Sequence, residues 1–269
     1  MKPLGQHFLV NRATVRTIIK HLDPQRGETI IEIGPGTGVL TIPFAEVCAQ
    51  VNAKFIAIEK DKQLAEKLVN SINSNWKLEV MIGDALKIIP KLITDNRLPI
   101  TNYKLVGNIP YYITGRLLRV ISEIEPKPTH ALLTIQEEVA QRITAKEPHM
   151  NLLSAITHAW AETHILARLK AEDFDPPPKV RSAIIELTAR REPLTPHFAS
   201  YVRLMKILFK QPRKTAFNNL RAGLRAPEKT LETCLREIGI HPAARPQELS
   251  LLMLVNLAAS LETKCDIIS

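Results

Sequence analysis

Short apolar segments alternate with amphipathic ones between residues 28 and 135, and this alternation is the most regular pattern in the chain. Apolar runs of a few residues, separated by stretches with apolar positions every three or four residues, are typical of a parallel sheet covered by helices on both faces. The pattern predicts an α/β fold. The expected strands are Thr29 to Ile33, Lys54 to Ile58, Leu78 to Ile82, Lys104 to Val106 and His130 to Ile135.

The segments on either side of this region extend the predicted sheet. A helix is expected from Arg12 to Leu22, where apolar residues recur at helical spacing. Two further strands are expected at His164 to Leu169 and at Ser182 to Leu187. The loop between them contains Asp175-Pro-Pro-Pro-Lys179, and proline cannot donate a hydrogen bond to a strand ladder. We therefore predict a hairpin at the edge of the sheet.

The pattern changes near Pro193. Beyond this residue the chain shows helical periodicity without strand-like runs, and Pro193 and Pro196 mark the change. The sequence therefore predicts two domains: an α/β domain over residues 1–192 and a small all-helical domain over residues 193–269.

Composition and charge narrow the possible functions. The formal net charge is +9, and because a basic surface attracts phosphate-rich ligands, a polyanionic partner is expected. Cys48, Cys234 and Cys265 are too far apart to indicate a disulfide framework, and the eight His residues lack the paired spacing of a metal site. No apolar run is long enough for a signal peptide or a membrane span. We expect a soluble cytoplasmic protein without a metal.

A glycine-rich segment directly follows the first predicted strand. It is Glu32-Ile-Gly34-Pro-Gly36-Thr-Gly38, and glycines at this place allow the backbone to approach a ligand closely. A dinucleotide-binding motif would have its third glycine at position 39, which is Val39. The spacing favours a nucleoside cofactor without a pyrophosphate, although a glycine-rich turn can also serve structure alone.

Two acidic residues follow the next two predicted strands. Glu59 can accept hydrogen bonds from both hydroxyls of a ribose, as an acidic residue does at this place in dinucleotide folds. Asp84 can accept a hydrogen bond from an adenine amine. Either residue could instead cap a helix, and for Asp84 this alternative is strong because residues 85–92 have a helical pattern.

The fourth predicted strand leads into Asn108-Ile109-Pro110-Tyr111. This tetrad resembles the one in amino-group methyltransferases. An adenine N6 amine is a poor nucleophile because its lone pair is delocalised into the ring. The side-chain oxygen of Asn108 and the carbonyl of Pro110 can accept its two hydrogens and aim the nitrogen, without a general base. Tyr111 can stack on the target base.

Motifs from one end of the chain to the other resemble a narrower group, the ribosomal RNA adenine dimethyltransferases. They are Gly5-Gln-His-Phe-Leu9, the Asn108 tetrad, Phe174-Asp-Pro-Pro-Pro-Lys-Val180, and Arg213-Lys-Thr215 with Asn218-Asn-Leu220. The resemblance implies a Rossmann-like class I methyltransferase domain and a helical C-terminal domain. It also implies S-adenosylmethionine-dependent N6,N6-dimethylation of two adjacent adenines near the 3′ end of small-subunit (16S) ribosomal RNA, within the immature small subunit.

The same resemblance assigns roles to individual residues. It places His7, Leu9, Gly34, Gly36, Glu59, Asp84 and Asn108 at the cofactor, and Asn108, Pro110, Tyr111 and Phe174 at the target base, with Phe174 closing the second face of the base. A monomer is expected, because no long apolar stripe remains unexplained.

A basic segment in the helical domain is the expected RNA contact. Between Arg203 and Lys229 there are eight basic residues and one acidic residue, Glu228, which exceeds the alternating pairs of an ordinary solvated helix face. Those we assign to RNA phosphates are Lys206, Lys210, Arg213, Lys214, Arg221 and Arg225.

The chain departs from the family pattern at three places. Pro212 stands where a second Arg usually precedes Arg213, Arg181 stands where Asp is common, and the basic N-terminal arm is reduced to Met1-Lys2. These departures bear on RNA docking. Two alternatives remain: a large-subunit adenine methyltransferase of the macrolide-resistance type, against which the Phe174 and Arg213 motifs weigh, and a methyltransferase-like ribosome assembly factor.

Overall fold

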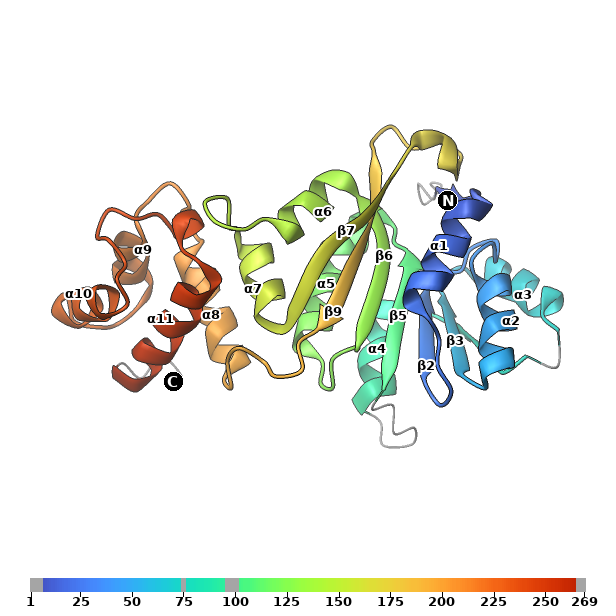
Figure 1. Ribbon diagram of the computed structural model, residues 1–269, viewed down its shortest axis with the longest axis horizontal. Helices are drawn as coiled ribbons and strands as arrows, with labels where there is room; N and C mark the ends of the chain where they lie inside the picture. Colours follow the sequence, from blue (N-terminus) through green and yellow to red (C-terminus); the bar gives the residue numbers. More distant parts are fainter. Residues whose placement is uncertain (1–6, 74–75, 95–101, 265–269) are drawn as a thin grey trace. The chain divides into compact units, whose positions relative to one another are not determined.

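The computed structural model describes residues 7–73, 76–94 and 102–264, and Gly5, Gln6, the Met1-Lys2 arm and Cys265 therefore lie outside the described residues. The chain forms two compact units (Figure 1). The first comprises Met1–Ala140 and His164–Ala189, and the second comprises Gln141–Thr163 and Arg190–Ser269.

The strands of the first unit form a seven-stranded sheet with the order β4-β3-β2-β5-β6-β9-β7. Strands β2 to β6 pair in parallel, and β9 is antiparallel to β6. The predicted α/β fold and edge hairpin are confirmed. The strands are β2 (Thr29–Ile33), β3 (Lys54–Glu59), β4 (Leu78–Ile82), β5 (Tyr103–Asn108), β6 (His130–Gln136), β7 (Ala161–Leu169) and β9 (Ser182–Ala189).

Helices cover both faces of this sheet. Figure 1 shows α1 and α2 on one face and α4 and α5 on the other. On the first face, Val15 and Ile18 of α1 and Phe44 of α2 pack with Ile30 and Val106 of the sheet, and all five are buried. The helices are α1 (Arg12–Leu22), α2 (Thr41–Val51), α3 (Lys62–Ser71), α4 (Ala85–Thr94), α5 (Thr114–Glu123) and α6 (Glu137–Thr144).

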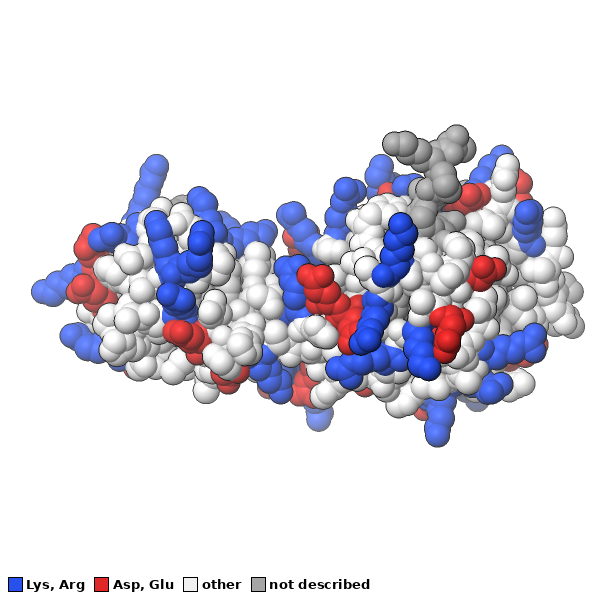
Figure 2. Space-filling model, turned by 90° about the horizontal axis from the view of Figure 1, so that it is seen from above, with Lys and Arg blue, Asp and Glu red and all other residues white. Residues whose placement is uncertain are grey.

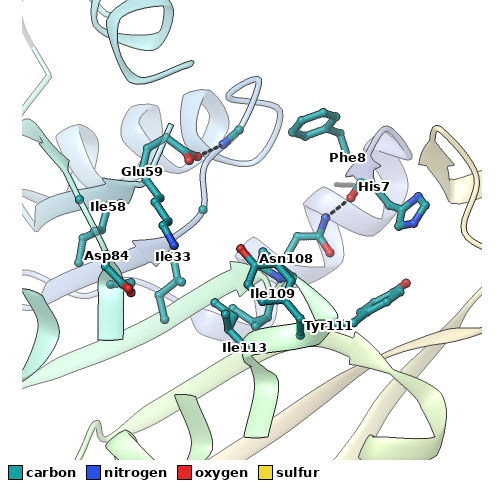
Figure 3. A pocket seen from close by; sticks show the side chains of 17 residues that line it. His7, Phe8, Ile33, Ile58, Glu59, Asp84, Asn108, Ile109, Tyr111 and Ile113 are labelled. Atoms are coloured by element: carbon teal, nitrogen blue, oxygen red, sulfur yellow. Dashed lines mark hydrogen bonds between the residues drawn. The ribbon is translucent and has the colours of Figure 1, made fainter. Parts of the chain in front are cut away.

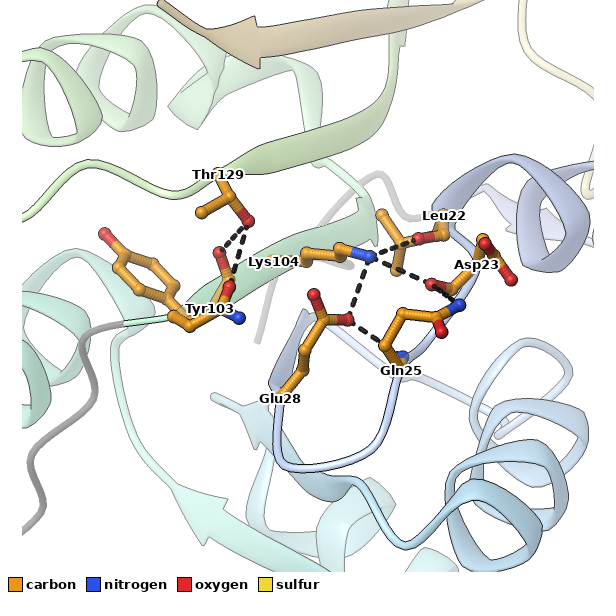
Figure 4. Close-up of polar contacts among 8 residues, drawn as sticks. Leu22, Asp23, Gln25, Glu28, Tyr103, Lys104 and Thr129 are labelled. Carbon is orange, nitrogen blue, oxygen red and sulfur yellow. Dashed lines mark hydrogen bonds and ion pairs between the residues drawn. The ribbon is translucent and has the colours of Figure 1, made fainter. Parts of the chain in front are cut away.

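A buried ion pair lies at the amino ends of the parallel strands (Figure 4). Lys104 Nζ lies 2.8 Å from Glu28 Oε2, and it donates hydrogen bonds of 2.9 Å to the carbonyls of Leu22 and Asp23. Both side chains are about nine-tenths buried. Because a buried charge needs full pairing, the ammonium stabilises the end of α1 against β2 and β5.

A second, two-stranded sheet joins the N-terminal segment to the proline loop. Strands β1 (Phe8–Leu9) and β8 (Phe174–Asp175) are antiparallel. The amide of Val10 and the side chain of Asn11 extend the contact by donating to the carbonyl and the carboxylate of Asp173, at 2.8 and 2.6 Å. We call this β1–β8 pair the clasp.

The second unit is helical in its described part, apart from the first residues of β7. A buried cluster containing Leu204, Leu208, Leu254 and Leu257 forms its core, and Tyr201 donates to the carbonyl of Ala155 at 3.0 Å. Residues 141–163 belong to this unit, whereas the sequence had placed them in the α/β domain, and a domain boundary near residue 193 stays a prediction. The helices are α7 (Leu152–Trp160), α8 (Phe198–Leu208), α9 (Ala216–Gly223), α10 (Glu228–Glu237) and α11 (Leu251–Lys264).

Candidate active site

A pocket lies at the carboxyl ends of β2, β3, β4 and β5, where parallel strands bring their following loops together (Figure 3). Of the residues that the sequence proposed for cofactor and target, those that line it are His7, Gly34, Gly36, Glu59, Asp84, Asn108, Pro110 and Tyr111. Residues from strands far apart in the chain thus converge on one cavity.

The glycine-rich turn brings backbone to the pocket wall. Gly36 has a φ of +57°, and a Cβ at this position would lie 2.6 Å from the Phe8 ring, which also lines the pocket. A larger residue would be strained and would displace Phe8. The turn after β2 therefore needs glycine both for its conformation and for the close approach of the N-terminal segment.

Glu59 is placed to bind two hydroxyl groups. Its side chain is buried, with Oε2 accepting the Gly36 amide at 3.0 Å and Oε1 accepting the Asp61 amide at 2.9 Å. Each carboxylate oxygen has two lone pairs, so one on each oxygen is left for a ligand. The two backbone donors fix the carboxylate in an orientation suited to a bidentate contact with a ribose.

Asp84 has the capping role that the sequence proposed, and it also lines the pocket. Its Oδ1 accepts the Leu86 amide at 3.0 Å, which is the geometry of a cap at the start of α4. The residue also lines the pocket, opposite Asn108 in Figure 3. Capping occupies one oxygen and holds the side chain in place, while the carboxylate keeps acceptor capacity for an amine.

Asn108 has one orientation, set by the N-terminal segment. Its Nδ2 donates to the carbonyl of His7 at 2.6 Å, so its oxygen is the end of the amide that remains as an acceptor (Figure 3). The Pro110 carbonyl accepts the Ile113 amide at 3.0 Å and retains a second lone pair. The side-chain oxygen of Asn108 and the carbonyl oxygen of Pro110 are therefore both available as hydrogen-bond acceptors at the pocket.

Tyr111 and His7 are held by contacts to the loop that ends in β9. The Tyr111 hydroxyl hydrogen-bonds Ser182 Oγ at 2.7 Å, and the His7 Nδ1 lies 2.7 Å from the carbonyl of Pro176. The two rings are 6.0 Å apart between centroids. Both side chains are thereby fixed at the wall of the pocket.

Leu9 and Phe174 do not line this pocket. They face each other across the clasp, are 5% and 3% exposed, and pack into the same core cluster as Val15 and Ile18. Leu9 contributes to a smaller cavity that it shares with Gly34 and Asn108. In this structure the Phe174 ring does not reach a base in the pocket, so its stacking role would require the ring to leave the core and stays a prediction.

Several pocket residues carry little sequence signal of a site, because most are apolar and the others lie within or directly beside the motifs described above. They are Phe8, Ile33, Ile58, Lys60, Gly83, Ala85, Ile109, Tyr112 and Ile113. Ile33 and Ile58 are the last apolar residues of their strands, and this position was their only sequence signal. Apolar walls between carboxylates suit a flat heterocycle that is hydrogen-bonded at its edges.

Glu32, at the carboxyl end of β2, is a buried acid just behind the glycine-rich turn. Burial raises the pKa of Glu32 to about 8, and the charge of Glu59 adds to the rise. Its Oε2 has no hydrogen-bond partner among the described residues. Glu32 is therefore mainly protonated at neutral pH.

The proposed RNA-binding residues all lie on the surface of the helical unit. Lys206, Lys210, Arg213, Lys214, Arg221 and Arg225 are exposed. Figure 2 shows Lys and Arg side chains projecting from this unit, with few acidic ones among them. Arg221 pairs with Glu228 at 3.5 Å and lies over the Phe217 ring, so its charge is partly shared within the protein.

A single buried side chain supports the loop that carries Arg213 and Lys214. Asn219 Oδ1 accepts the Gln211 amide at 3.1 Å, and its Nδ2 donates to the carbonyls of Gln211 and Thr215 at 3.0 and 3.1 Å. Thr215 caps α9 by accepting the Asn218 amide. The loop therefore keeps a defined conformation although Pro212 breaks the helical pattern.

The fold and the pocket define a class of protein. A Rossmann-like sheet with a glycine-rich turn after β2, an acid after β3 and an Asn-Ile-Pro-Tyr segment after β5 is the architecture of an amino-group methyltransferase that uses a nucleoside cofactor. Residues 1–261 match the family described as ribosomal RNA adenine dimethylase, and the chain belongs to this family.

Individual relatives agree with this membership. A protein of Dehalococcoides mccartyi named ribosomal RNA small subunit methyltransferase A is 33% identical to this chain, over 93% of this chain and 84% of the relative. A protein of the same name in Lactobacillus acidophilus is 32% identical, over 98% of this chain and 92% of the relative. The crystal structure of the 23S rRNA methyltransferase ErmE has a TM-score of 0.74 at 25% identity, covering 95% of this chain and 99% of that one. A dimethyladenosine transferase from Plasmodium falciparum shares the fold, with a TM-score of 0.78 at 24% identity, covering 96% and 98%.

The pocket fits S-adenosylmethionine. Glu59 keeps a lone pair on each carboxylate oxygen, Asp84 keeps acceptor capacity beside its helix cap, and Ile33 and Ile58 are apolar lining residues, a set of groups suited to a ribose and an adenine. Within the described ranges, no group of three or more His, Cys, Asp or Glu side chains is arranged to hold a metal ion. Nor does any helix in those ranges have both the length and the apolar character needed to cross a bilayer.

Proposed function

We propose that this protein transfers methyl groups from S-adenosylmethionine to the N6 amines of adenines in small-subunit ribosomal RNA, and that it dimethylates two adjacent adenines near the 3′ end. The observation that carries the proposal is the orientation of Asn108, whose Nδ2 is engaged by the His7 carbonyl at 2.6 Å. Its oxygen then remains as an acceptor for an amine at the carboxyl end of β5.

The cofactor is held by the wall opposite this amide. Glu59 binds the ribose, Asp84 binds the adenine, and the backbone at Gly34 and Gly36 allows close approach. His7 closes the pocket from the N-terminal segment, and Leu9 supports it from the core. Bound S-adenosylmethionine supplies an electrophilic methyl group on its sulfonium sulfur.

The residues after β5 prepare the nucleophile. The Asn108 oxygen and the Pro110 carbonyl accept the two hydrogens of the adenine amine, which draws its lone pair out of conjugation and aims it into the pocket. Tyr111, held by Ser182, stacks on the base and is expected to contribute roughly 1–3 kcal/mol. Positioning and acceptor geometry, rather than proton abstraction before attack, supply the catalysis, and the methylated amine loses its extra proton to solvent afterwards.

RNA docking is assigned to the helical unit. Its six exposed cations on α8, α9 and the loops beside them match a phosphate backbone, and Asn219 keeps the Arg213 loop in place. We propose that the protein acts as a monomer on the immature small subunit in the cytoplasm. We also propose that residues 193–269 form the part specialised for this docking.

A large-subunit methyltransferase is the alternative that fold likeness alone leaves open, because ErmE has the same architecture. The relatives named as small-subunit enzymes favour the proposal, since they are 32 to 33% identical and cover nearly the whole chain. A role confined to ribosome assembly is disfavoured by the completeness of the cofactor wall.

The test uses labelled S-adenosylmethionine with unmethylated small subunits and, in parallel, large subunits. Wild type is expected to label small subunits only, and Asn108→Ala is expected to label neither while it still binds S-adenosylhomocysteine. Asn108→Asp keeps an acceptor oxygen but loses the hydrogen bond to His7, so transfer should fall less than in Asn108→Ala. Labelling of large subunits only would contradict the proposal, and so would full activity of Asn108→Ala.

A further inference from the structure

An exposed aromatic side chain stands at the mouth of the pocket. Tyr112 follows Tyr111 in the short η1 helix (Tyr111–Ile113), lines the pocket and is 54% exposed. Neighbouring Tyr111 is more buried and tied to Ser182, whereas no hydrogen bond of the Tyr112 side chain is found within the described residues. An exposed ring beside a substrate pocket offers a flat surface to a part of the substrate that does not enter.

The surface continues from Tyr112 along the first turn of α5. η1 runs directly into this helix, so residues three and four positions after Tyr112 fall on the same side. These are Gly115, where a Cβ would meet no atom within 4 Å, and Arg116, which is exposed. In the part of the chain that the structure describes, no carboxylate pairs with Arg116.

We propose that Tyr112, Gly115 and Arg116 form a track for the RNA strand that flanks the target adenine. The neighbouring base stacks on Tyr112, its phosphate contacts Arg116, and the absent side chain at Gly115 lets the strand approach the helix. The inference rests on the proposed function, because the flanking strand is defined by the adenine held at Asn108.

Single-stranded RNA is the partner that this combination fits. Every base has a π face that can stack on an aromatic ring whatever its sequence, and an unpaired guanidinium one helical turn away matches the adjoining phosphate. Continuity with the pocket supports the assignment, since Tyr112 belongs to both. If two adjacent adenines are modified in turn, Tyr112 would hold the second adenine while the first is in the pocket.

The experiment measures binding and transfer with a single-stranded RNA that contains two adjacent adenines, one replaced by fluorescent 2-aminopurine. Tyr112→Ala is expected to weaken binding about 5- to 150-fold, the effect of losing one stacked base, and to relieve fluorescence quenching. Tyr112→Phe retains the ring and should bind within about twofold of wild type. Arg116→Gln should reduce the slope of log affinity against log salt by roughly 0.7.

Controls separate this inference from the proposed function. Arg26→Gln removes an exposed charge from the loop before β2, at the amino ends of the parallel strands and away from the pocket, and should leave affinity and salt slope unchanged. Binding of S-adenosylhomocysteine should be equal to that of wild type in Tyr112→Phe, Arg116→Gln and Arg26→Gln, and the loss of transfer should appear in KM for RNA rather than in kcat. RNA binding is measured without transfer, so it reports on the track even if wild type methylates a different RNA.

Unchanged RNA affinity and salt slope in both Tyr112→Ala and Arg116→Gln would overturn the inference, and the exposed ring would then be assigned to contact with a protein. A fall in kcat or in cofactor binding without a change in RNA affinity would also overturn it, because Tyr112 would then act within the pocket.

Discussion

The replacement of Glu59 by Gln tests how the pocket recognises a ribose. The wild-type carboxylate accepts the amides of Gly36 and Asp61, one at each oxygen, and has one lone pair per oxygen left for the ligand. Glutamine has one oxygen and one nitrogen, and the nitrogen only donates. One of the two backbone amides must then face another donor, and one ribose hydroxyl must lose its acceptor, while the other keeps only a neutral one.

The magnitude of the effect follows from these contacts. A hydrogen bond to a charged group contributes about 1.5–3 kcal/mol, so the loss of one ribose contact should weaken binding of S-adenosylhomocysteine about 10- to 150-fold. The opposed amide is that of Gly36, which is buried, or of Asp61, which is partly buried, and leaving it unsatisfied costs about 1–3 kcal/mol of stability in the free protein. Glu59→Gln should therefore lower the melting temperature by several degrees but still fold.

Isothermal titration calorimetry of S-adenosylhomocysteine measures the affinity, and circular dichroism confirms the fold. Glu79→Gln is the matched control, because the exposed Glu79 pairs with Lys54 at 3.2 Å and a surface pair contributes little. The control should bind within about twofold of wild type. A Glu59→Gln protein that is folded and binds as tightly as wild type would refute the assignment of Glu59 to the ribose.

Three further predictions concern stability and RNA docking. Burial raises the pKa of Glu32 from 4.5 to about 8, so the folded protein holds this proton more tightly than the unfolded chain. The contribution of this group to stability is complete below pH 4.5 and is lost as the pH rises through about 8. Urea unfolding of cofactor-free protein at several pH values should show a smaller decrease for Glu32→Gln. At Gly107 a Cβ would lie 2.4 Å from the Ile33 carbonyl, so Gly107→Ala should cost about 1–3 kcal/mol of unfolding free energy, whereas Gly115→Ala, with open space around it, should be neutral or stabilising. Asn219→Asp places a carboxylate against two backbone carbonyls and should disorder the basic loop, which would raise KM for RNA and flatten its salt dependence without changing cofactor affinity.

The sequence predicted the elements that depend on local pattern. β2 and β4 occupy the predicted residues because each is a short apolar run bounded by polar or turn residues, and the carboxyl ends of such strands necessarily meet. The residues at these ends, including Glu59, were therefore within reach of sequence reasoning. The capping role of Asp84 was also predictable, since it precedes a helical pattern.

Contacts between distant segments were beyond that reasoning. The clasp pairs two-residue strands that are more than 160 residues apart, and strands this short have no periodicity to detect. It buries Phe174, for which sequence similarity had suggested a place in the pocket. The orientation of Asn108 comes from the carbonyl of His7, a backbone group that any residue would supply and that carries no sequence signal.

Dimethylation of small-subunit RNA by this protein can be measured on the nucleosides of small-subunit RNA from cells that lack the protein. Mass spectrometry is expected to show that N6,N6-dimethyladenosine is missing from two adjacent positions near the 3′ end, that wild-type protein restores both, and that Asn108→Ala restores neither. Dimethyladenosine that persists in the small subunit, or that is lost only from the large subunit, would contradict the account.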